Sequence, residues 1–217
     1  ATPVTLALRE GALLAGLESG EMETVAASDA VAKVNLGNLA AALARGGWGA
    51  TTVSTSLWAC ARAGIETLVT GGIGGAHRGF GRTLDISSDL TALSRWPVLV
   101  VCAGVKSLLD VAATREHLET LGAPVLGWRT DCFPRFYLRE SAIPLDARVE
   151  TAAEVARIAR LHWSAGGAGI VLAAPCPEAA ALREEEFEEA LALAEFERET
   201  SRRSEERRVG KECTIQC

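Results

Sequence analysis

Residues 98–110 read VLVVCAGVKSLLD, and this stretch indicates most clearly how the chain folds. The run Val98–Val101 is aliphatic and mostly β-branched, which is typical of a strand that is buried on both faces of a parallel sheet. Gly104 permits a tight turn, and residues 107–110 have the composition of a helix start. Lys106 therefore follows a buried strand at its carboxyl end, the edge at which open α/β sheets form their binding crevices.

Lys106 in this position has two interpretations. Burial favours the neutral form of an amine, and a neutral amine can attack a carbonyl carbon as a nucleophile. A lysine at the end of a strand can equally lay its aliphatic stem over apolar surface and keep its charged group in water. The neighbouring motifs have to distinguish the two.

Short apolar runs alternate with helical patterns in the rest of the chain. The further runs that have the length of strands are residues 4–8, 66–70, 124–128 and 169–174. The patterns with helical spacing are residues 39–43, 57–63, 111–121 and 152–163. This alternation predicts an α/β fold with three layers, α/β/α, around a mostly parallel sheet.

The composition fits one domain with a substantial core, since 48% of the 217 residues are hydrophobic. A net charge of −6 argues against a nucleic-acid partner. We also expect no membrane partner, because the sequence has neither a bilayer-spanning apolar run nor a secretion signal. The six cysteines include no CxxC pair, which favours a reducing, cytoplasmic location over a disulfide or zinc framework. Cys102 is expected to be a small buried hydrophobe.

We expect the α/β domain to span residues 1–182, with residues 33–36 as a short connection inside it. Residues 183–202 have the pattern of an acidic helix, which we expect to be detached from the core. The last segment, residues 203–217, begins with RSEERRVGKEC and has no hydrophobic period. That string resembles the translation of a sequencing adapter, so we interpret the segment as an artefactual, disordered tail.

Residues 70–79, TGGIGGAHRG, form a glycine-rich stretch after a predicted strand, here called the glycine loop. Its backbone N–H groups could approach a phosphate, or the glycines could serve a purely structural turn. The spacing meets the GxGxxG dinucleotide fingerprint only in part, and the next strand ends without an acidic residue to hold a ribose. Both facts argue against a nucleotide-dependent oxidoreductase. His77 could be a metal ligand, an acid–base group or a buried core histidine.

Residues 84–90, LDISSDL, are called the aspartate motif and carry two carboxylates four positions apart, Asp85 and Asp89. Such a pair lies on one face of a helix and is separated in a loop. Carboxylate oxygens suit a hard divalent cation such as magnesium or manganese. Asp and Ser before an apolar run also cap helices, so a capping cluster is the alternative.

Several long motifs occur together in one order: GATTVSTS, TGGIGGAHRG, LDISSDL, VVCAGVKSLLD, GWRTDCFPRFY and AAPCPE. From Thr2 to about Leu182 the chain thereby resembles the pseudouridine-5′-phosphate glycosidases, a family that includes the indigoidine-synthase A-like proteins. The resemblance implies a cytoplasmic, homotrimeric lyase. Its substrates would be pseudouridine 5′-phosphate, uracil and ribose 5-phosphate, and it would cleave or form the C–C bond between base and sugar.

The resemblance also implies residue roles. Lys106 would attack C1 of the ring-opened sugar and form an imine. An imine provides an electron sink, which matters because a C-glycosidic bond has no leaving oxygen that an acid could protonate. Asp85 would bind manganese or another divalent cation. The positions that would contact substrate are Lys33, Val53, His77, Ser87, Ser88 and Asp89.

The chain also departs from the family pattern. The family's general acid is a glutamate in an N-terminal motif similar to ALEST, and neither Glu10 nor Glu18 replaces it in this register. The helical region that follows AAPCPE in the family is not matched either. We therefore expect a piece of a longer enzyme, slower by roughly 10²–10⁴-fold without its general acid. The alternative is a catalytically silent fragment that binds a sugar phosphate.

Overall fold

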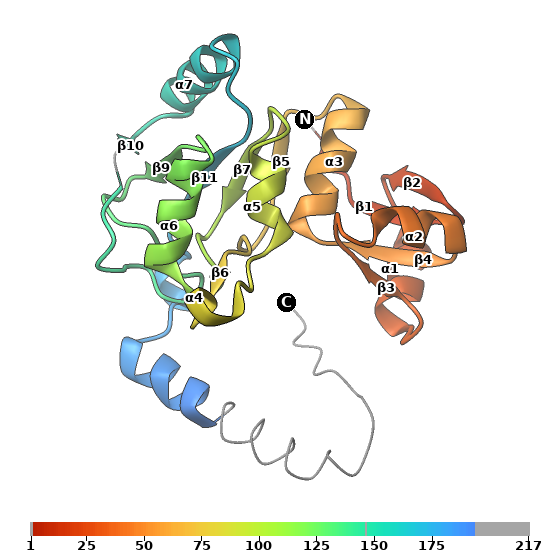
Figure 1. Ribbon diagram of the computed structural model, residues 1–217, viewed down its shortest axis with the longest axis horizontal. Helices are drawn as coiled ribbons and strands as arrows, with labels where there is room; N and C mark the ends of the chain where they lie inside the picture. The colour runs from red at the N-terminus through yellow and green to blue at the C-terminus, as the bar shows by residue number, and fades with distance from the viewer. Residues whose placement is uncertain (1, 146, 194–217) are drawn as a thin grey trace.

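The structure, a computed structural model, describes residues 2–145 and 147–193. These residues form two main β-sheets, which are connected through helix α3 (Val53–Ala63) (Figure 1). The predicted tail over residues 203–217 lies outside the described residues, as does the acidic helix beyond residue 193. None of the described helices is both long and apolar enough to cross a membrane.

The larger sheet contains five strands that all run parallel, in the order β10-β9-β11-β7-β5. Its strands are β5 (Thr67–Val69), β7 (Leu99–Cys102), β9 (Val125–Trp128), β10 (Ala147–Val149) and β11 (Ile170–Ala173). Four of them coincide with predicted strands, so the prediction of a mostly parallel sheet is confirmed. The sequence does not predict β10, because it is only 3 residues long and includes the polar Arg148.

Helices cover both faces of the larger sheet. They are α3, α5 (Ser88–Leu93), α6 (Val111–Thr120) and α7 (Ala152–Ser164). Alternate side chains of a strand point to opposite faces, so Val100 and Cys102 of β7 pack with α3, α5 and α6. Val155 and Ala159 of α7 pack on the other face, against Leu172 of β11. The predicted α/β/α layers are therefore confirmed.

The smaller sheet is built from the first third of the chain, in the order β2-β1-β4-β3. Its strands are β1 (Leu6–Arg9), β2 (Ala12–Ala15), β3 (Ala32–Val34) and β4 (Trp48–Thr51), accompanied by α1 (Ser19–Ala27) and α2 (Leu39–Arg45). The prediction of a connection at residues 33–36 is wrong for its first two residues, Lys33 and Val34. They pair in parallel with β4 because Val34 is fully buried with Leu8 and Leu39 in a small core of its own.

The chain beyond Lys106 also differs from the prediction. The expected helix start at residues 107–110 is wrong, because Leu109–Asp110 form a short strand, β8. This strand pairs antiparallel with β6 (Ala76–His77), which precedes helix α4 (Phe80–Thr83) in the chain. Helix α6 begins only at Val111, where Asp110 caps it by accepting a 2.9 Å hydrogen bond from the Ala113 N–H.

The acidic helix is attached to the rest of the molecule, so the prediction of a detached helix is wrong for the part that the structure describes. After a 3-10 turn at Glu178–Ala180, residues 184–193 are helical. Phe187 and Leu191 lie four residues apart on one face and are buried against Leu138. A narrow apolar stripe therefore anchors a helix whose composition is otherwise polar.

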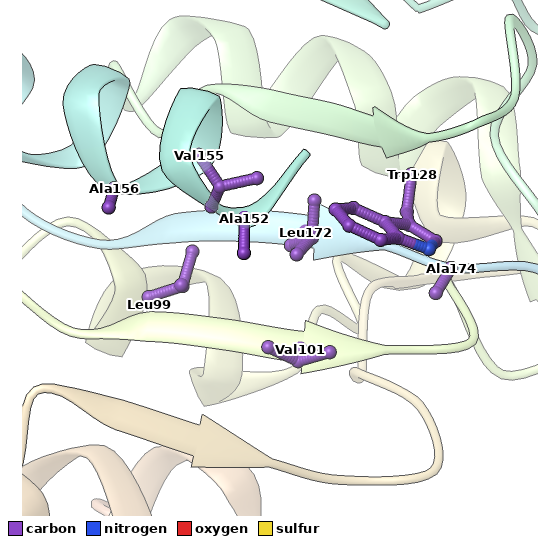
Figure 2. Close-up of a pocket in the computed structure, with 8 residues that line it drawn as sticks. All are labelled: Leu99, Val101, Trp128, Ala152, Val155, Ala156, Leu172 and Ala174. Carbon is purple, nitrogen blue, oxygen red and sulfur yellow. The ribbon is translucent and has the colours of Figure 1, made fainter. Parts of the chain in front are cut away.

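Helix α7 leaves part of its face of the larger sheet open. Beside it, Leu99 and Val101 of β7 line an apolar groove of about 370 Å³ together with Trp128 (Figure 2). The other lining residues are Ala152, Val155, Ala156, Leu172 and Ala174. On the neighbouring strand β5, Val69 is 75% exposed. Helices α3, α5 and α6 thus cover the sheet more completely than α7 does.

Cys102 gives a test of this burial. It is 4% exposed, as predicted for a small buried hydrophobe, and burial raises the pKa of its thiol to about 11. At about pH 8 the thiol is both protonated and inaccessible, so we expect iodoacetamide to modify the partly exposed Cys176 and to spare Cys102 until the chain unfolds. Timed alkylation read by peptide mass spectrometry measures both rates. Equal rates in the folded chain would contradict the placement of β7.

Candidate active site

The glycine loop lies between the aspartate motif and the residues around Lys106, and it bonds to both. On one side, the Ile73 N–H donates to the Gly104 carbonyl at 3.0 Å, and the Lys106 N–H donates to the Ile73 carbonyl at 3.1 Å. On the other side, the Ser87 N–H donates to the Gly75 carbonyl at 3.0 Å. Three motifs that are separate in the sequence therefore lie side by side at the carboxyl edge of the larger sheet.

The glycines of this loop allow close packing. A Cβ atom on Gly74 would overlap the side chain of Ser87, and one on Gly75 would overlap the side chain of Thr114. Several N–H groups of the loop are also in use: Gly74 donates to a carboxylate oxygen of Asp89, and Ala76 donates to the Thr114 hydroxyl at 3.0 Å. Of the two interpretations of the loop, these contacts favour the structural turn over a phosphate cradle.

Asp89 connects the glycine loop to helix α3. Its carboxylate is buried, with the residue 4% exposed, and each oxygen accepts a backbone hydrogen bond of 2.8 Å, Oδ1 from Ser54 and Oδ2 from Gly74. Its own N–H donates to the Ser87 hydroxyl, which caps α5, at 3.2 Å. Asp89 therefore has a structural task, and its predicted contact with substrate stays a prediction.

Hydroxyl groups gather around the first turn of α3. The Ser54 hydroxyl lies 2.9 Å from the Thr52 hydroxyl and accepts a 3.0 Å hydrogen bond from the Ser88 hydroxyl. Val53, the first residue of the helix, lies between Thr52 and Ser54. The sequence-based prediction includes Val53 and Ser88 but misses Ser54, although GATTVSTS contains the hydroxyl-rich signal that would identify it.

Lys33 is exposed on β3, next to the same helix start. The carbonyl of the following residue, Val34, accepts hydrogen bonds from the Thr52 N–H at 2.9 Å and from the Thr55 hydroxyl at 2.8 Å. These bonds attach the end of β3 to the first turn of α3. The cationic Lys33 and the N-terminus of the 11-residue helix α3 are therefore neighbours. A positive charge and a helix N-terminus both favour the binding of an anion.

Asp85 and His77 form an exposed pair. Asp85 Oδ2 lies 3.7 Å from His77 Nδ1, with the two side chains 62% and 51% exposed. Within residues 2–145 and 147–193 there is no group of three His, Cys, Asp or Glu side chains placed to hold a metal ion. A hard divalent cation bound through Asp85 would therefore take most of its ligands from water or from substrate oxygens, as magnesium-type ions commonly do.

Lys106 is exposed, whereas its neighbours Val105 and Ser107 are buried. The expectation of a desolvated amine is therefore not met by the described residues. The physical reason is the backbone: Val105 pairs with Ile73, so this segment is extended and its side chains alternate between core and solvent. The backbone at Lys106 is held firmly while its amine is open to solvent.

A family model described as "Indigoidine synthase A like protein" matches residues 1–214. The chain belongs to this family. It is 45% identical over 202 residues to the pseudouridine-5′-phosphate glycosidase of Sorangium cellulosum, a match that covers 91% of this chain and 64% of the relative. With the enzyme of the same name from Cupriavidus pinatubonensis it shares 47% identity over 189 residues, or 87% of this chain and 60% of the relative.

Two solved structures have a similar fold. The prealnumycin C-glycosynthase AlnA, in complex with ribulose 5-phosphate, matches 92% of this chain and 67% of its own with a TM-score of 0.85 and 39% identity. An indigoidine synthase A-like protein from Thermotoga maritima matches 86% of this chain and 62% of its own with a TM-score of 0.80 and 35% identity. The chain spans 60–64% of the length of the two glycosidases.

The bridge at Asp89 predicts a measurable loss of stability. Asp89→Ala leaves the buried N–H groups of Ser54 and Gly74 without an acceptor, and each unsatisfied group costs roughly 1–3 kcal/mol. We expect urea denaturation to show a correspondingly lower free energy of unfolding. The matched control is Asp85→Ala, which removes an exposed carboxylate of the same motif and should change that free energy by about 0.5 kcal/mol or less. Equal effects of the two substitutions would contradict the assignment.

Proposed function

We propose that the protein to which this chain belongs is a pseudouridine-5′-phosphate glycosidase, which reversibly cleaves the C–C bond between uracil and ribose 5-phosphate. The observation that supports it most is the fixed backbone of Lys106 beside the glycine loop and the aspartate motif, in a chain 45% identical to such an enzyme over 202 residues. Because the chain spans less than two thirds of that relative, the activity is proposed for the longer protein.

Lys106 is the proposed nucleophile. In the direction of synthesis its neutral amine adds to the aldehyde carbon of ring-opened ribose 5-phosphate, and loss of water gives an imine at C1. In the direction of cleavage the amine instead attacks C1 of the nucleotide and displaces the ring oxygen. The nitrogen lone pair then forms the same imine as the C–C bond breaks, and uracil leaves with the electron pair of that bond, so that its carbon takes a proton. The exposure of Lys106 is compatible with access of a sugar phosphate to this amine.

We propose that the 5-phosphate binds at the start of α3, close to Lys33. The proposed donor to the phosphate is the N–H of Val53 at the head of the helix, because the Ser54 N–H already donates to Asp89. The Ser88 hydroxyl donates to Ser54, and its oxygen can accept a hydrogen bond from a hydroxyl of the sugar. Lys33 provides a compact positive charge. Ser87 and Asp89 complete the substrate-contacting set on the aspartate motif, in addition to the structural bonds that both make.

Asp85 is the proposed ligand of manganese or another divalent cation, with His77 beside it. A bound cation of this type polarises a substrate oxygen. Asp85 suits it because its carboxylate is exposed and stands apart from the buried bridge that Asp89 makes.

The second candidate function is a catalytically silent fragment that binds a sugar phosphate. The exposure of Lys106 favours it, because the amine lies in solvent and not in the apolar surroundings that activate a lysine nucleophile. The two candidates agree on the phosphate site and differ only in whether Lys106 forms a covalent bond to the sugar.

Reductive trapping distinguishes them. The sequence contains three lysines, Lys33, Lys106 and Lys211, so an adduct can be assigned by digestion and mass spectrometry. With ribose 5-phosphate and borohydride we expect an adduct on Lys106 that forms faster than any on the other two, because only Lys106 lies at the proposed reacting carbon. Lys106→Arg should abolish it.

Ribose without phosphate is the control, and it should give less Lys106 adduct at equal concentration because the phosphate site contributes nothing to its binding. Adducts that form equally on all three lysines would reflect unspecific glycation and contradict the proposed nucleophile. Binding of ribose 5-phosphate without an adduct would support the silent fragment.

A further inference from the structure

The backbone around Lys106 is held on its second side by residues 133–138, FPRFYL, here called the aromatic segment. The Ser107 hydroxyl donates a 2.5 Å hydrogen bond to the Arg135 carbonyl, and it accepts one of 3.4 Å from the Tyr137 N–H. Ser107 is 4% exposed, so this bond is shielded from water. The residue that directly follows Lys106 is therefore fixed by the main chain of Arg135.

The packing at this contact leaves little freedom. Gly104 has a φ of 90°, and a Cβ atom there would overlap the Pro134 carbonyl oxygen. Phe136 also has a positive φ, 61°, and its ring lies against Gly72 of the glycine loop. A non-glycine residue in this conformation is unfavourable by itself and persists where the surrounding contacts determine it. The aromatic segment is thus held in a strained shape directly against the Lys106 backbone.

The side chain of Arg135 connects this segment to the acidic helix. The side chain is only 15% exposed, and its guanidinium lies 2.6 Å from a carboxylate oxygen of Glu184 and 3.6 Å from one of Glu188. It also lies 5.7 Å from the centre of the Phe187 ring. A nearly buried arginine that meets two carboxylates and an aromatic ring is restricted in position. Its backbone carbonyl, the acceptor for Ser107, is restricted with it.

We propose that Arg135 and Ser107 are positioning residues for Lys106. Arg135 fixes its own carbonyl by binding the acidic helix, the carbonyl fixes Ser107, and Ser107 fixes the start of the lysine side chain. This inference rests on the proposed function, because it concerns the reach of the Lys106 amine toward C1 of the sugar. It predicts a role in the covalent step and none in binding the phosphate, which is proposed at α3.

The test is the rate of borohydride trapping on Lys106 as a function of ribose 5-phosphate concentration in the full chain. Ser107→Ala and Arg135→Met should lower the limiting rate roughly 10- to 100-fold, because small misplacements of a reacting group are costly. The half-saturating concentration should change less than about twofold. Arg135→Lys, which keeps the charge, should recover part of the rate.

Matched controls use residues with similar bonds elsewhere. Ser164→Ala removes an exposed hydroxyl that donates to the Leu161 carbonyl, and Arg148→Met removes a surface arginine paired with Asp131 and Glu150. Both should leave trapping unchanged. If Arg135→Met fails to fold, the double variant Glu184→Gln/Glu188→Gln weakens the same connection at exposed carboxylates and should lower the limiting rate in the same way.

Two results would overturn the inference, and they have different consequences for the proposed function. A Lys106 adduct that forms at an unchanged limiting rate in folded Ser107→Ala and in the glutamine double variant would remove the positioning role and leave the proposed function intact. A complete absence of the Lys106 adduct in the unsubstituted chain would overturn the role of Lys106 as the nucleophile in this chain, and this inference with it.

Discussion

The arrangement of the candidate site depends on one buried carboxylate that bridges two backbone N–H groups. Asp89 accepts from Ser54 at the start of α3 and from Gly74 in the glycine loop, each at 2.8 Å. A buried charge without such partners would be unfavourable, so the bridge is strongly specified once Asp89 lies in the core. It joins the smaller sheet, through α3, to the edge of the larger sheet where Lys106 lies.

The glycine loop connects this bridge to Lys106 through backbone hydrogen bonds. The loop can lie within hydrogen-bond distance of both the aspartate motif and the lysine backbone because Gly74 and Gly75 have no side chains to keep them apart. The aromatic segment closes the other side through Ser107. Buried residues and their backbone hydrogen bonds therefore hold the main chain of the site in place. The side chains of Lys33 and Lys106 are exposed to solvent.

Much of the fold follows from the sequence, because the strands of the larger sheet are aliphatic runs and the helices that cover it keep a clear period. The smaller sheet could not be predicted from the sequence, because its strand β3 is only 3 residues long and Val34 is the one buried residue in it. Within the site, the sequence supplies both carboxylates of the aspartate motif but cannot tell them apart: Asp89 is buried by its fold partners and Asp85 is not. The exposure of Lys106 and the attachment of the acidic helix through Phe187 likewise depend on contacts distant in the chain.

The most direct test of this account is amide hydrogen exchange at Ser54 and Gly74, measured by NMR. If one buried carboxylate holds both groups, both amides exchange slowly in the unsubstituted chain, and Asp89→Ala accelerates the two together. Fast exchange of either amide in the unsubstituted chain, or acceleration of only one of them by the substitution, would contradict a bridge at Asp89.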